Sequence, residues 1–313
     1  MEASTFTRPE RGAELDLRID ALAYGGNGIA RMEGYVVFVS GAIPGDLVRA
    51  VVTKRKRAYA EARTIEVLEP SPERIAPLAD HPGTPWQVLP YERQLAVKHE
   101  QVRDALTRIG RLEGFELDDI VPAVEQWRYR NKLEYSFGTA TDGTLICGFH
   151  APGSWHDIVP VTDCLLASER SNGAREQVLA WCREQDLQAF DRRTHTGLLR
   201  NLVVREGRRT AQLQVRLVTG PGDIDGPSLA AAVDCEGLSW TTTDALAETT
   251  LVGETIKLAG NRTLEEELCG LSFSIAPNAA QLVEAGYALK RVVPVDMFPQ
   301  TPHIECVALL DRA

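Results

Sequence analysis

The sequence between Leu15 and Leu68 reads LDLRIDALAYGGNGIARMEGYVVFVSGAIPGDLVRAVVTKRKRAYAEARTIEVL. Short apolar runs in this stretch are separated by GGNG, PGD and other turn-forming residues at intervals of about ten residues, which is typical of the strands of a small barrel. A barrel closes on itself and leaves few free strand edges. We therefore predict that residues 1–70 form a small β-barrel.

The composition indicates a soluble globular protein. The chain has 313 residues, of which 44% are hydrophobic and 25% are charged, so disorder is not expected. No apolar run approaches the roughly 20 residues that span a bilayer, and the start, MEASTFTRPERGAELDL, lacks the features of an export signal. We predict a cytoplasmic protein with no membrane partner. The cysteines are widely spaced, without a CxxC pair, and are expected to be reduced thiols and not metal ligands: Cys147, Cys164, Cys182, Cys235, Cys269 and Cys306.

The charge distribution matters more than the net charge of −10, which by itself argues against a nucleic-acid partner. Residues 1–70 hold 10 Lys/Arg and 10 Asp/Glu, so the whole acidic excess lies in residues 71–313. The cations of the barrel segment are bunched beside one aromatic residue: Lys54, Arg55, Lys56, Arg57 and Tyr59. Such groups bind single-stranded RNA, because cations follow the phosphates and aromatic rings stack on bases. The alternative is a solvated edge strand protected by charge.

The rest of the chain is predicted to contain a linker, an α+β domain and a short C-terminal segment. Residues 71–90 hold five prolines and little periodicity, as a linker does. Residues 91–276 combine several strands with two helical stretches, near 91–112 and 171–185, and with a hairpin that turns at Gly-Arg-Arg. Residues 277–313 are predicted to form a helix followed by two strands.

The first helix is predicted to be amphipathic. One side carries the apolar residues Leu95, Val102, Leu106, Ile109 and Leu112. Charged residues are expected mostly on the opposite, outer side: Glu92, Arg93, Lys98, Glu100 and Arg103.

The stretch WRYRNKLEYSF, residues 127–137, alternates apolar and charged residues. A single strand would place an aromatic face on one side and a mainly cationic face on the other. The aromatic and apolar positions are Trp127, Tyr129, Leu133, Tyr135 and Phe137. The charged residues Arg128, Arg130 and Lys132, with Glu134, are candidates for contact with an RNA backbone. The alternative is an amphipathic strand with a wet outer side.

These features together resemble the RNA uracil-5 methyltransferases, a bacterial family that methylates C5 of uridine in ribosomal or transfer RNA. The barrel with GGNGIAR, PGD and KRKRAYAEAR is similar to the TRAM domain of that family. YRNKLEYSFG, LICGFHAPGSWHDIVPVTDC, LLRNLVVRE and LEEELCGLSFSIAPNA resemble its central domain, and GYALKRVVPVDMFPQTPHIE resembles its C-terminal signature. The resemblance implies RNA as the partner, with 23S ribosomal RNA expected ahead of transfer RNA and no DNA. It also implies S-adenosylmethionine as the methyl donor.

The resemblance implies an α+β protein with an N-terminal OB-like (TRAM) barrel and, in residues 277–313, a fragment of a Rossmann-like class I methyltransferase fold. In the family, a cofactor loop and a cysteine nucleophile loop follow the SPNA segment. Here IAPNA, ending at Ala279, continues directly into AQLVEAGY. Roughly a hundred or more residues of a doubly wound cofactor domain are therefore expected to be absent.

Glu305 matches the catalytic base of the family by position. In the reaction that the resemblance implies, a thiolate adds to C6 of uracil, C5 takes the methyl group from S-adenosylmethionine, and a base removes the C5 proton before the thiol leaves C6. Glu305 would be that base; the alternative is a solvated carboxylate at the start of a strand. We find no substitute for the nucleophile, because Cys306 is expected to point into the core when Glu305 points outward, and Cys269 is expected to be buried.

Many members of the family carry an iron–sulfur cluster on four cysteines, three of them near a CGGCxxQ pattern. The corresponding stretch here is HPGTPWQ, without cysteine, and only Cys164 stands where the fourth ligand would be. One thiol does not hold a cluster that needs about four. We therefore predict no cluster and a packed Cys164.

A glycine-rich turn in VRLVTGPGDIDGPSLAAAV superficially suits a nucleotide. Such a turn between a strand and a helix is usually only a connection, with Asp225 or Ser228 capping the helix, so we assign no cofactor-binding residue. The sequence thus predicts a uracil-5 methyltransferase, by family, that is catalytically defective as it stands. The alternatives are a non-catalytic RNA-binding protein and a damaged product that folds poorly.

Overall fold

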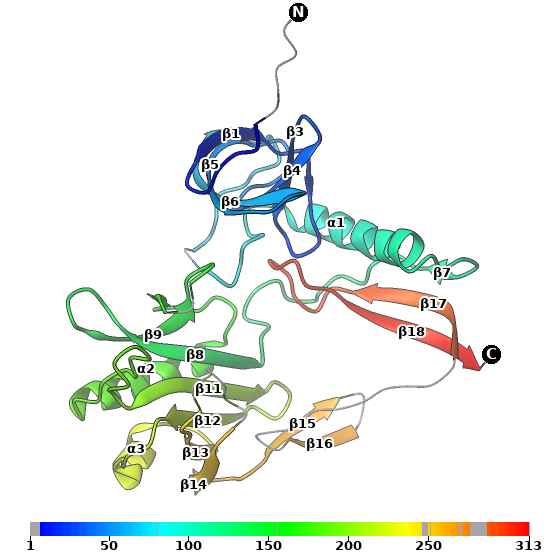
Figure 1. Ribbon diagram of the computed structural model, residues 1–313. Coiled ribbons are helices and arrows are strands. Elements are labelled where there is room, and N and C mark those ends of the chain that lie inside the picture. Colours follow the sequence, from blue (N-terminus) through cyan, green and yellow to red (C-terminus); the bar gives the residue numbers. More distant parts are fainter. Residues whose placement is uncertain are drawn as a thin grey trace, which may run out of the picture. The chain divides into compact units, whose positions relative to one another are not determined.

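The computed structural model describes residues 7–79, 81–154, 156–245, 250, 252–268, 271–275 and 287–312. The chain divides into two compact units (Figure 1). Residues 1–126 and 285–313 make up the first, which we call the barrel unit, and residues 127–284 make up the second, the sheet unit. In the part of the chain that is described, no helix has the length and apolarity to cross a membrane.

The barrel unit is built mainly from strands. Its elements are β1 (Glu14–Arg18), β2 (Ala21–Leu22), β3 (Gly28–Met32), β4 (Tyr35–Ser40), β5 (Leu47–Arg55), β6 (Tyr59–Glu69), α1 (Tyr91–Asp104), a π-helical turn (Ala105–Ile109), β7 (Glu116–Leu117), β17 (Tyr287–Val295) and β18 (Glu305–Arg312). The predicted strands of residues 15–68 are confirmed.

Strands β1 to β6 form one six-stranded sheet in the order β1-β5-β6-β4-β3-β2. In β4 every second residue is buried, because Tyr35, Val37 and Val39 point into the barrel while the residues between them are partly exposed. The core of the barrel consists of small and β-branched residues, with Val37, Val48 and Ala50 fully buried. The alternation in the sequence therefore reflects one buried and one wet face.

The PGD turn is held by the buried carboxylate of Asp46. Its oxygens accept hydrogen bonds from the backbone N–H groups of Ile43, at 2.9 Å, and Ser71, at 2.8 Å, and form an ion pair with Arg74 at 2.6 Å. Burial opposes ionisation, but the bonds from Arg74 and the two N–H groups outweigh it and lower the pKa of Asp46. Asp46 thus fixes the start of the proline-rich segment to the barrel.

The proline-rich segment 71–90 is well packed in its second half. Trp86 and Leu89 are each 1% exposed, and His81 and Thr84 are also buried. The side-chain amide of Gln87 bonds to the carbonyl of Ala79 and accepts bonds from neighbouring N–H groups. This segment leads directly into helix α1.

Helix α1 begins at Tyr91, as predicted, and passes into the π-helical turn before residue 110. The predicted polarity of the helix is wrong at three positions. Lys98 is fully buried, whereas Ile109 and Leu112, expected on the inner side, are 80% and 39% exposed. The physical reason for the burial of Lys98 is an ion pair with a partner far away in the sequence, which is described below.

The C-terminal strands pair with each other and with the segment after α1. β17 and β18 are antiparallel, and β17 pairs with the short β7 in parallel. Arg291 of β17 forms two hydrogen bonds with the carboxylate of Asp118, at 2.7 and 2.9 Å. The two predicted strands are confirmed, while the predicted helix before them begins in residues 281–286, outside the described residues, and Tyr287–Lys290 are already strand.

The sheet unit is an α+β arrangement. Its elements are β8 (Lys132–Thr139), β9 (Leu145–His150), β10 (Ile158–Pro160), α2 (Glu169–Glu184), β11 (Leu199–Gly207), β12 (Gln212–Thr219), α3 (Gly226–Ala232), β13 (Gly237–Thr242), β14 (Glu254–Gly260), β15 (Leu264–Leu268) and β16 (Leu271–Ile275).

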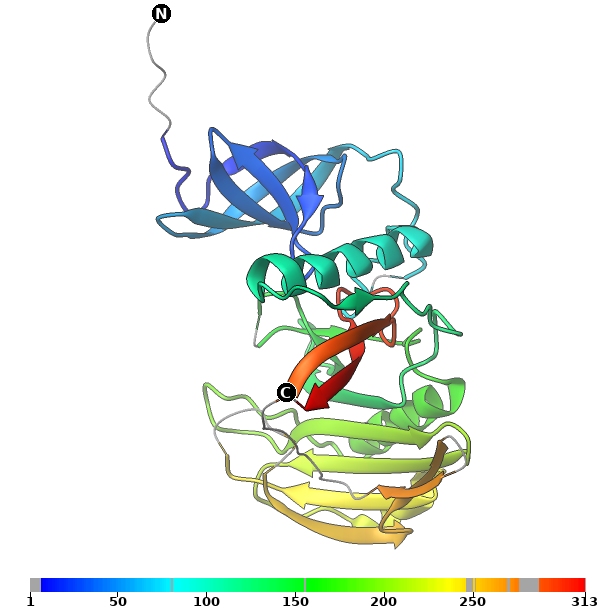
Figure 2. The ribbon, with the colours of Figure 1, turned by 90° about the vertical axis from the view of Figure 1, so that its right-hand side faces the viewer.

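Seven of these strands form one sheet in the order β10-β9-β8-β11-β12-β13-β14 (Figure 2). Within this sheet, among the described residues, only the β12 to β13 pair is parallel, as the intervening helix α3 requires. The predicted hairpin is confirmed as β11 and β12. The predicted second helix is confirmed as α2. Ser168 caps this helix, because its side chain accepts the N–H of Ser171 at 3.0 Å. The core lies between α2, α3 and one sheet face and includes Tyr135, Trp181 and Leu202.

The stretch 127–137 is only partly a strand. Strand β8 starts at Lys132, and Leu133, Tyr135 and Phe137 are buried as predicted. The preceding residues do not continue it, because Arg128 has a left-handed backbone (φ 53°) and its N–H bonds to the carbonyl of Leu165. The prediction of one continuous strand is therefore wrong for residues 127–131.

Candidate functional site

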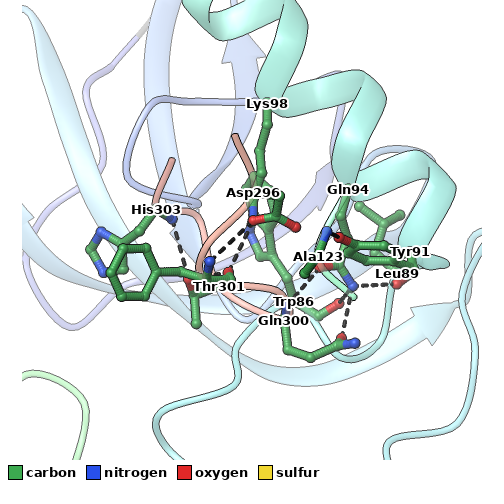
Figure 3. A network of polar contacts seen from close by, with 11 residues as sticks. Trp86, Leu89, Tyr91, Gln94, Lys98, Ala123, Asp296, Gln300, Thr301 and His303 are labelled. Atoms are coloured by element: carbon green, nitrogen blue, oxygen red, sulfur yellow. Dashed lines mark hydrogen bonds and ion pairs between the residues drawn. The ribbon is translucent and has the colours of Figure 1, made fainter. Parts of the chain in front are cut away.

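The segment VDMFPQTPHIE, residues 295–305, connects β17 to β18 and packs on helix α1 within the barrel unit (Figure 3). Asp296, Gln300 and Thr301 are between 1% and 4% exposed. Buried polar side chains are normally satisfied by hydrogen bonds. The partners found here come mainly from α1 and from the segment that leads into it.

Lys98 and Asp296 form an ion pair of 2.5 Å in which both side chains are completely buried. The ammonium group of Lys98 also donates to the carbonyl of Phe298 at 3.0 Å, and it lies 5.8 Å from the centre of the Trp86 ring. Burial lowers the pKa of Lys98, against the opposing effect of the Asp296 carboxylate. A pair of this kind is rigid, because each charge depends on the other for its solvation.

Gln94, one helical turn before Lys98, is also fully buried. Its amide oxygen accepts the backbone N–H of Gln300 at 2.8 Å, and its amide nitrogen donates to the side-chain oxygen of Gln300 at 2.8 Å and to the carbonyl of Leu89 at 2.8 Å. The carbonyl of Gln300 in turn accepts the N–H of Trp86 at 3.1 Å. Two turns of α1 therefore hold both the backbone and the side chains of this loop.

Tyr91 completes this side of the helix. Its hydroxyl oxygen accepts the N–H of Ala123 at 2.8 Å. Burial, reinforced by the nearby Asp296 carboxylate, raises the pKa of the Tyr91 phenol, so the phenol is neutral at physiological pH.

The loop ends with two exposed side chains, those of His303 and Glu305. Thr301 donates to the carbonyl of Phe298 at 2.7 Å and accepts the N–H of His303 at 3.3 Å, and the ring of His303 meets that of Phe298 edge to face at 6.0 Å. Glu305 is the first residue of β18, pairs in register with Val295, and is exposed. A rigid backbone thus presents an accessible carboxylate, an arrangement that can accept a proton from a bound molecule.

The expectation for Cys306 is wrong. It is exposed and not directed into a core, because β18 is an edge strand of a sheet of three strands. Partial burial and the neighbouring Glu305 raise the pKa of the Cys306 thiol, which disfavours the thiolate form that a nucleophile needs. Cys269 lies outside the described residues.

Sequence reasoning missed Gln94, Lys98, Asp296 and Gln300 as a connected set. A signal was present, since Tyr91, Gln94, Lys98 and Gln101 follow one another at helical spacing and form a polar stripe on α1. Gln101 also belongs to it, donating to the carbonyl of Ala23 in the barrel at 3.1 Å. A polar stripe on the inner side of a helix indicates buried polar partners, which the sequence alone does not identify.

The predicted cationic patch lies at the tip of the hairpin formed by β5 and β6. Lys54 pairs with Glu61 at 2.8 Å and Arg55 with Glu10 at 3.8 Å. Lys56 and Arg57 are exposed, and their side chains form no ion pair with any described residue. Tyr59 is half-buried and packs edge to face against Phe38 at 5.5 Å. The available charge of the patch therefore rests on two residues.

The three cations predicted in the sheet unit lie close together in sequence but differ in their contacts. Arg128 forms two hydrogen bonds with the carboxylate of Asp163, at 3.1 and 2.8 Å, and Lys132 pairs with Glu134 at 2.6 Å. Arg130 is half-buried, and its N–H bonds to the carbonyl of Leu166. Only part of the cationic charge of this segment is thus directed to solvent.

Two features bear on the cluster and the cofactor of the family, the thiol of Cys164 and the glycine-rich turn. Cys164 is fully buried, as predicted, and burial raises the pKa of its thiol. Among the described residues no group of three or more His, Cys, Asp or Glu side chains is placed to hold a metal ion. In the glycine-rich turn, the N–H of Gly220 bonds to the carbonyl of Leu198, and Asp225 caps α3 by accepting the N–H of Ser228 at 3.1 Å.

Comparison with known proteins identifies the barrel. The TRAM domain family matches residues 8–65, which include strands β1 to β5 and most of β6. Over a longer stretch, the chain is 34% identical to an uncharacterized RNA methyltransferase of Thermosynechococcus vestitus, across 85% of this chain and 61% of that protein. It is 33% identical to one of Gloeobacter violaceus, with the same two coverages. The chain thus spans about three-fifths of the length of these relatives.

Among solved structures, the fold is similar to that of the Pyrococcus abyssi tRNA (uracil-54, C5)-methyltransferase in complex with S-adenosyl-L-homocysteine. The TM-score is 0.74, and the alignment covers 95% of this chain and 100% of that chain at 19% sequence identity. This likeness concerns the fold. The sequence relatives and the TRAM match place the chain, over the part of those proteins that it spans, in the TRAM-domain RNA methyltransferases whose motifs it resembles.

Proposed function

We propose that the chain derives from an enzyme that methylates C5 of uridine in RNA, with 23S ribosomal RNA as the substrate, and that the chain by itself does not complete this reaction. The observation that carries the assignment is the loop of residues 295–305, whose buried contacts with α1 hold Glu305 at the start of β18. In this role Glu305 is the base that accepts the C5 proton of uridine. The proposed site of action is the cytoplasm.

The proposed defect rests on the sequence between the sheet unit and the C-terminal strands. IAPNA continues directly into AQLVEAGY, so the cofactor loop and the nucleophile cysteine of the family have no counterpart between them. Residues 277–313 would then be a fragment of the class I methyltransferase fold, following a TRAM barrel (1–70), a linker (71–90) and a central domain (91–276). S-adenosylmethionine would supply the methyl group in a complete enzyme.

Methyl transfer by the purified chain tests this proposal directly. With S-adenosylmethionine labelled in its methyl group and a uridine-containing 23S ribosomal RNA fragment, we expect no incorporation above that of a reaction without protein. Nuclease digestion and mass spectrometry of the RNA would detect 5-methyluridine independently of the label. Formation of 5-methyluridine that is lost in Glu305→Gln would overturn the proposed defect while supporting the role of the base.

The alternative function, a non-catalytic RNA-binding protein, is favoured by one specific observation. Lys56 and Arg57 at the β5–β6 hairpin tip carry exposed charges without ion-pair partners among the described residues. Cations of this kind release counterions from the phosphates when RNA binds, so affinity falls steeply as salt rises.

We expect the Lys56→Ala/Arg57→Ala double variant to bind single-stranded RNA more weakly and with less salt dependence. Loss of two phosphate contacts lowers the slope of log affinity against log salt by about 1.4, at ~0.7 per contact for single strands. Fluorescence anisotropy with a labelled oligonucleotide at several salt concentrations measures this slope. Arg31→Ala is the matched control, because Arg31 also lies on the barrel but pairs with Asp20 at 3.1 Å. An unchanged slope in the double variant would contradict the assignment.

A further inference from the structure

The sheet unit contains a cavity that no sequence motif indicated. Its volume is about 690 Å³, and its walls come from β8, β9, β10, the start of β11 and the loop that precedes β11. Sites for small molecules typically measure about 300–1,000 Å³, so this cavity is of the size that holds a nucleotide-sized ligand. All of its lining residues belong to the sheet unit, and none is among the RNA-binding residues predicted from the sequence.

Phe190 and Arg200 form a stacked pair, which we call the platform, in one part of the cavity wall. The guanidinium carbon of Arg200 lies 4.4 Å from the centre of the Phe190 ring, within the range of a cation–π contact. Arg200 also donates to the carbonyl of Ala245 at 2.6 Å, and the N–H of Phe190 bonds to the carbonyl of Leu199 at 2.8 Å. Both members of the platform are therefore fixed before any ligand arrives. Aromatic rings and guanidinium planes are the surfaces on which unstacked bases are held.

The lining is also cationic. Arg192, Arg193 and Arg200 contribute to it, against one acidic residue. That acidic residue, Asp191, is engaged within its own loop, where its carboxylate accepts the N–H of Arg193 at 2.7 Å. The guanidinium of Arg193 is 86% exposed and 4.0 Å from Asp191. Three guanidinium groups around one cavity, in a chain with a net charge of −10, favour an anionic ligand.

The loop that carries Arg192 and Arg193 is held in one conformation by backbone hydrogen bonds. The N–H of Asp191 bonds to the carbonyl of Thr196, and the N–H of His195 bonds to the carbonyl of Asp191, each at 2.8 Å. The loop closes at Gly197, whose φ is +87° and whose position leaves no room for a Cβ, since one would lie 2.1 Å from the carbonyl oxygen of Ala189. A site whose groups are fixed in advance loses little conformational entropy on binding.

We propose that this cavity binds one nucleotide of a single-stranded RNA, with the base stacked on the Phe190 and Arg200 platform and a phosphate between Arg192 and Arg193. The proposal rests on the RNA-binding function proposed above and assigns it a second contact, apart from the hairpin tip of the barrel. The chemistry recognised is that of a nucleoside phosphate, which could come from an RNA strand or from a free nucleotide.

The test uses the full chain with two probes, a 4-thiouridine-containing single-stranded RNA and free uridine monophosphate. Two variants remove parts of the site: Phe190→Leu keeps an apolar side chain but loses the flat ring, and Arg192→Ala/Arg193→Ala removes the phosphate contacts. Two are matched controls: Phe190→Tyr keeps the ring, and Lys257→Ala removes an exposed charge from β14.

We expect Phe190→Leu to weaken RNA binding by about tenfold, since one stacked base contributes ~1–3 kcal/mol. The arginine double variant should also bind more weakly, and both controls are expected to bind as the wild type does.

Crosslinking separates this proposal from the one on which it rests. Irradiation of bound RNA should label a peptide that contains residues 189–200, and the label should persist in the Lys56→Ala/Arg57→Ala variant of the barrel. If RNA binds but Phe190→Leu and Arg192→Ala/Arg193→Ala have no effect and no label appears in this loop, the cavity proposal is overturned while RNA binding stands. If only uridine monophosphate binds, in a way that depends on Phe190, the cavity takes free nucleotides and the RNA-strand proposal is overturned. If neither probe binds, both proposals fail.

Discussion

The Lys98→Met variant is expected to lose about 3–5 kcal/mol of the free energy of unfolding of the barrel unit, the usual penalty for removing one partner of a buried ion pair. Methionine fills a similar volume but leaves the carboxylate of Asp296, 1% exposed, without its counter-charge. The carbonyl of Phe298 loses its Lys98 donor as well. Neither group can reach water without displacing the loop of residues 295–305.

Native-state hydrogen exchange of the peptides that cover α1 and β17 measures this loss in the barrel unit alone. The Lys98→Met/Asp296→Asn double variant should recover much of it, because no buried charge then remains and the asparagine oxygen can still accept the N–H of Phe298, which lies 3.3 Å from the aspartate oxygen. Arg103→Met, which removes an exposed charge from the same helix, should stay within about 0.5 kcal/mol of the wild type. A loss below about 1 kcal/mol in Lys98→Met would show that the pair does not hold the loop.

This expected result also bears on the proposed chemistry. The carboxylate of Glu305 is exposed, so its position depends on the backbone at the start of β18. That backbone follows the loop that Lys98 and Gln94 hold from α1. If Glu305 is the base proposed above, Lys98 and Gln94 are positioning residues, and in a complete enzyme their loss would displace that proposed base without touching the uridine.

The sequence was a good guide where local patterns decide the structure. The strands of the barrel follow from alternation and from the GGNG and PGD turns, and the start of α1 at Tyr91 follows from its position after Pro90. Such features depend on residues within one or two turns of each other. They are consequently visible without knowledge of the rest of the chain.

The sequence was a poor guide where a partner distant in the sequence decides the burial or the backbone conformation of a residue. Lys98 was expected on the wet side of its helix because lysine is rarely buried, but its partner, Asp296, is 198 residues away. Arg128 was placed in a strand because it alternates with aromatic residues, whereas its bonds to Asp163 and a left-handed backbone take it out of the sheet. In both cases an ion pair with a residue distant in the sequence decides the structure, and the local sequence pattern does not.

The cavity of the sheet unit illustrates a further limit. The loop FDRRTHTG has no periodicity and reads as an ordinary turn, yet it brings Phe190, Arg192 and Arg193 to the same cavity as His150 and Arg200. What brings them together is the pairing of β9 with β10 and of β8 with β11. Strand β10 follows β9 closely, but β8 and β11 are separated by the whole of α2, and a pairing over that separation is not encoded in any short motif.

Replacing Gly148 by alanine tests that pairing, and we expect it to destabilise the β9 and β10 region by about 3 kcal/mol, near the upper end of the usual range for overpacking. Gly148 lies in the middle of β9 opposite Pro160 of β10. An added Cβ would lie 1.9 Å from the carbonyl oxygen of Val159 and 3.0 Å from the Cα of Pro160. Both obstacles are backbone atoms, so a change of side-chain rotamer gives no relief and β10 has to move away from β9.

The matched control is Gly173→Ala in helix α2. It is the same chemical change, but no heavy atom lies within 4 Å of the added Cβ, and alanine is favoured over glycine in a helix by about 0.8–1.0 kcal/mol. We therefore expect opposite signs: faster hydrogen exchange in peptides of β9 and β10 for Gly148→Ala, and slightly slower exchange in α2 for Gly173→Ala. Unchanged protection of β10 in Gly148→Ala would mean that this short strand is held by something other than its pairing with β9. Because His150 and Ile158 of these two strands line the cavity, the same variant should also weaken RNA binding if the cavity takes a nucleotide.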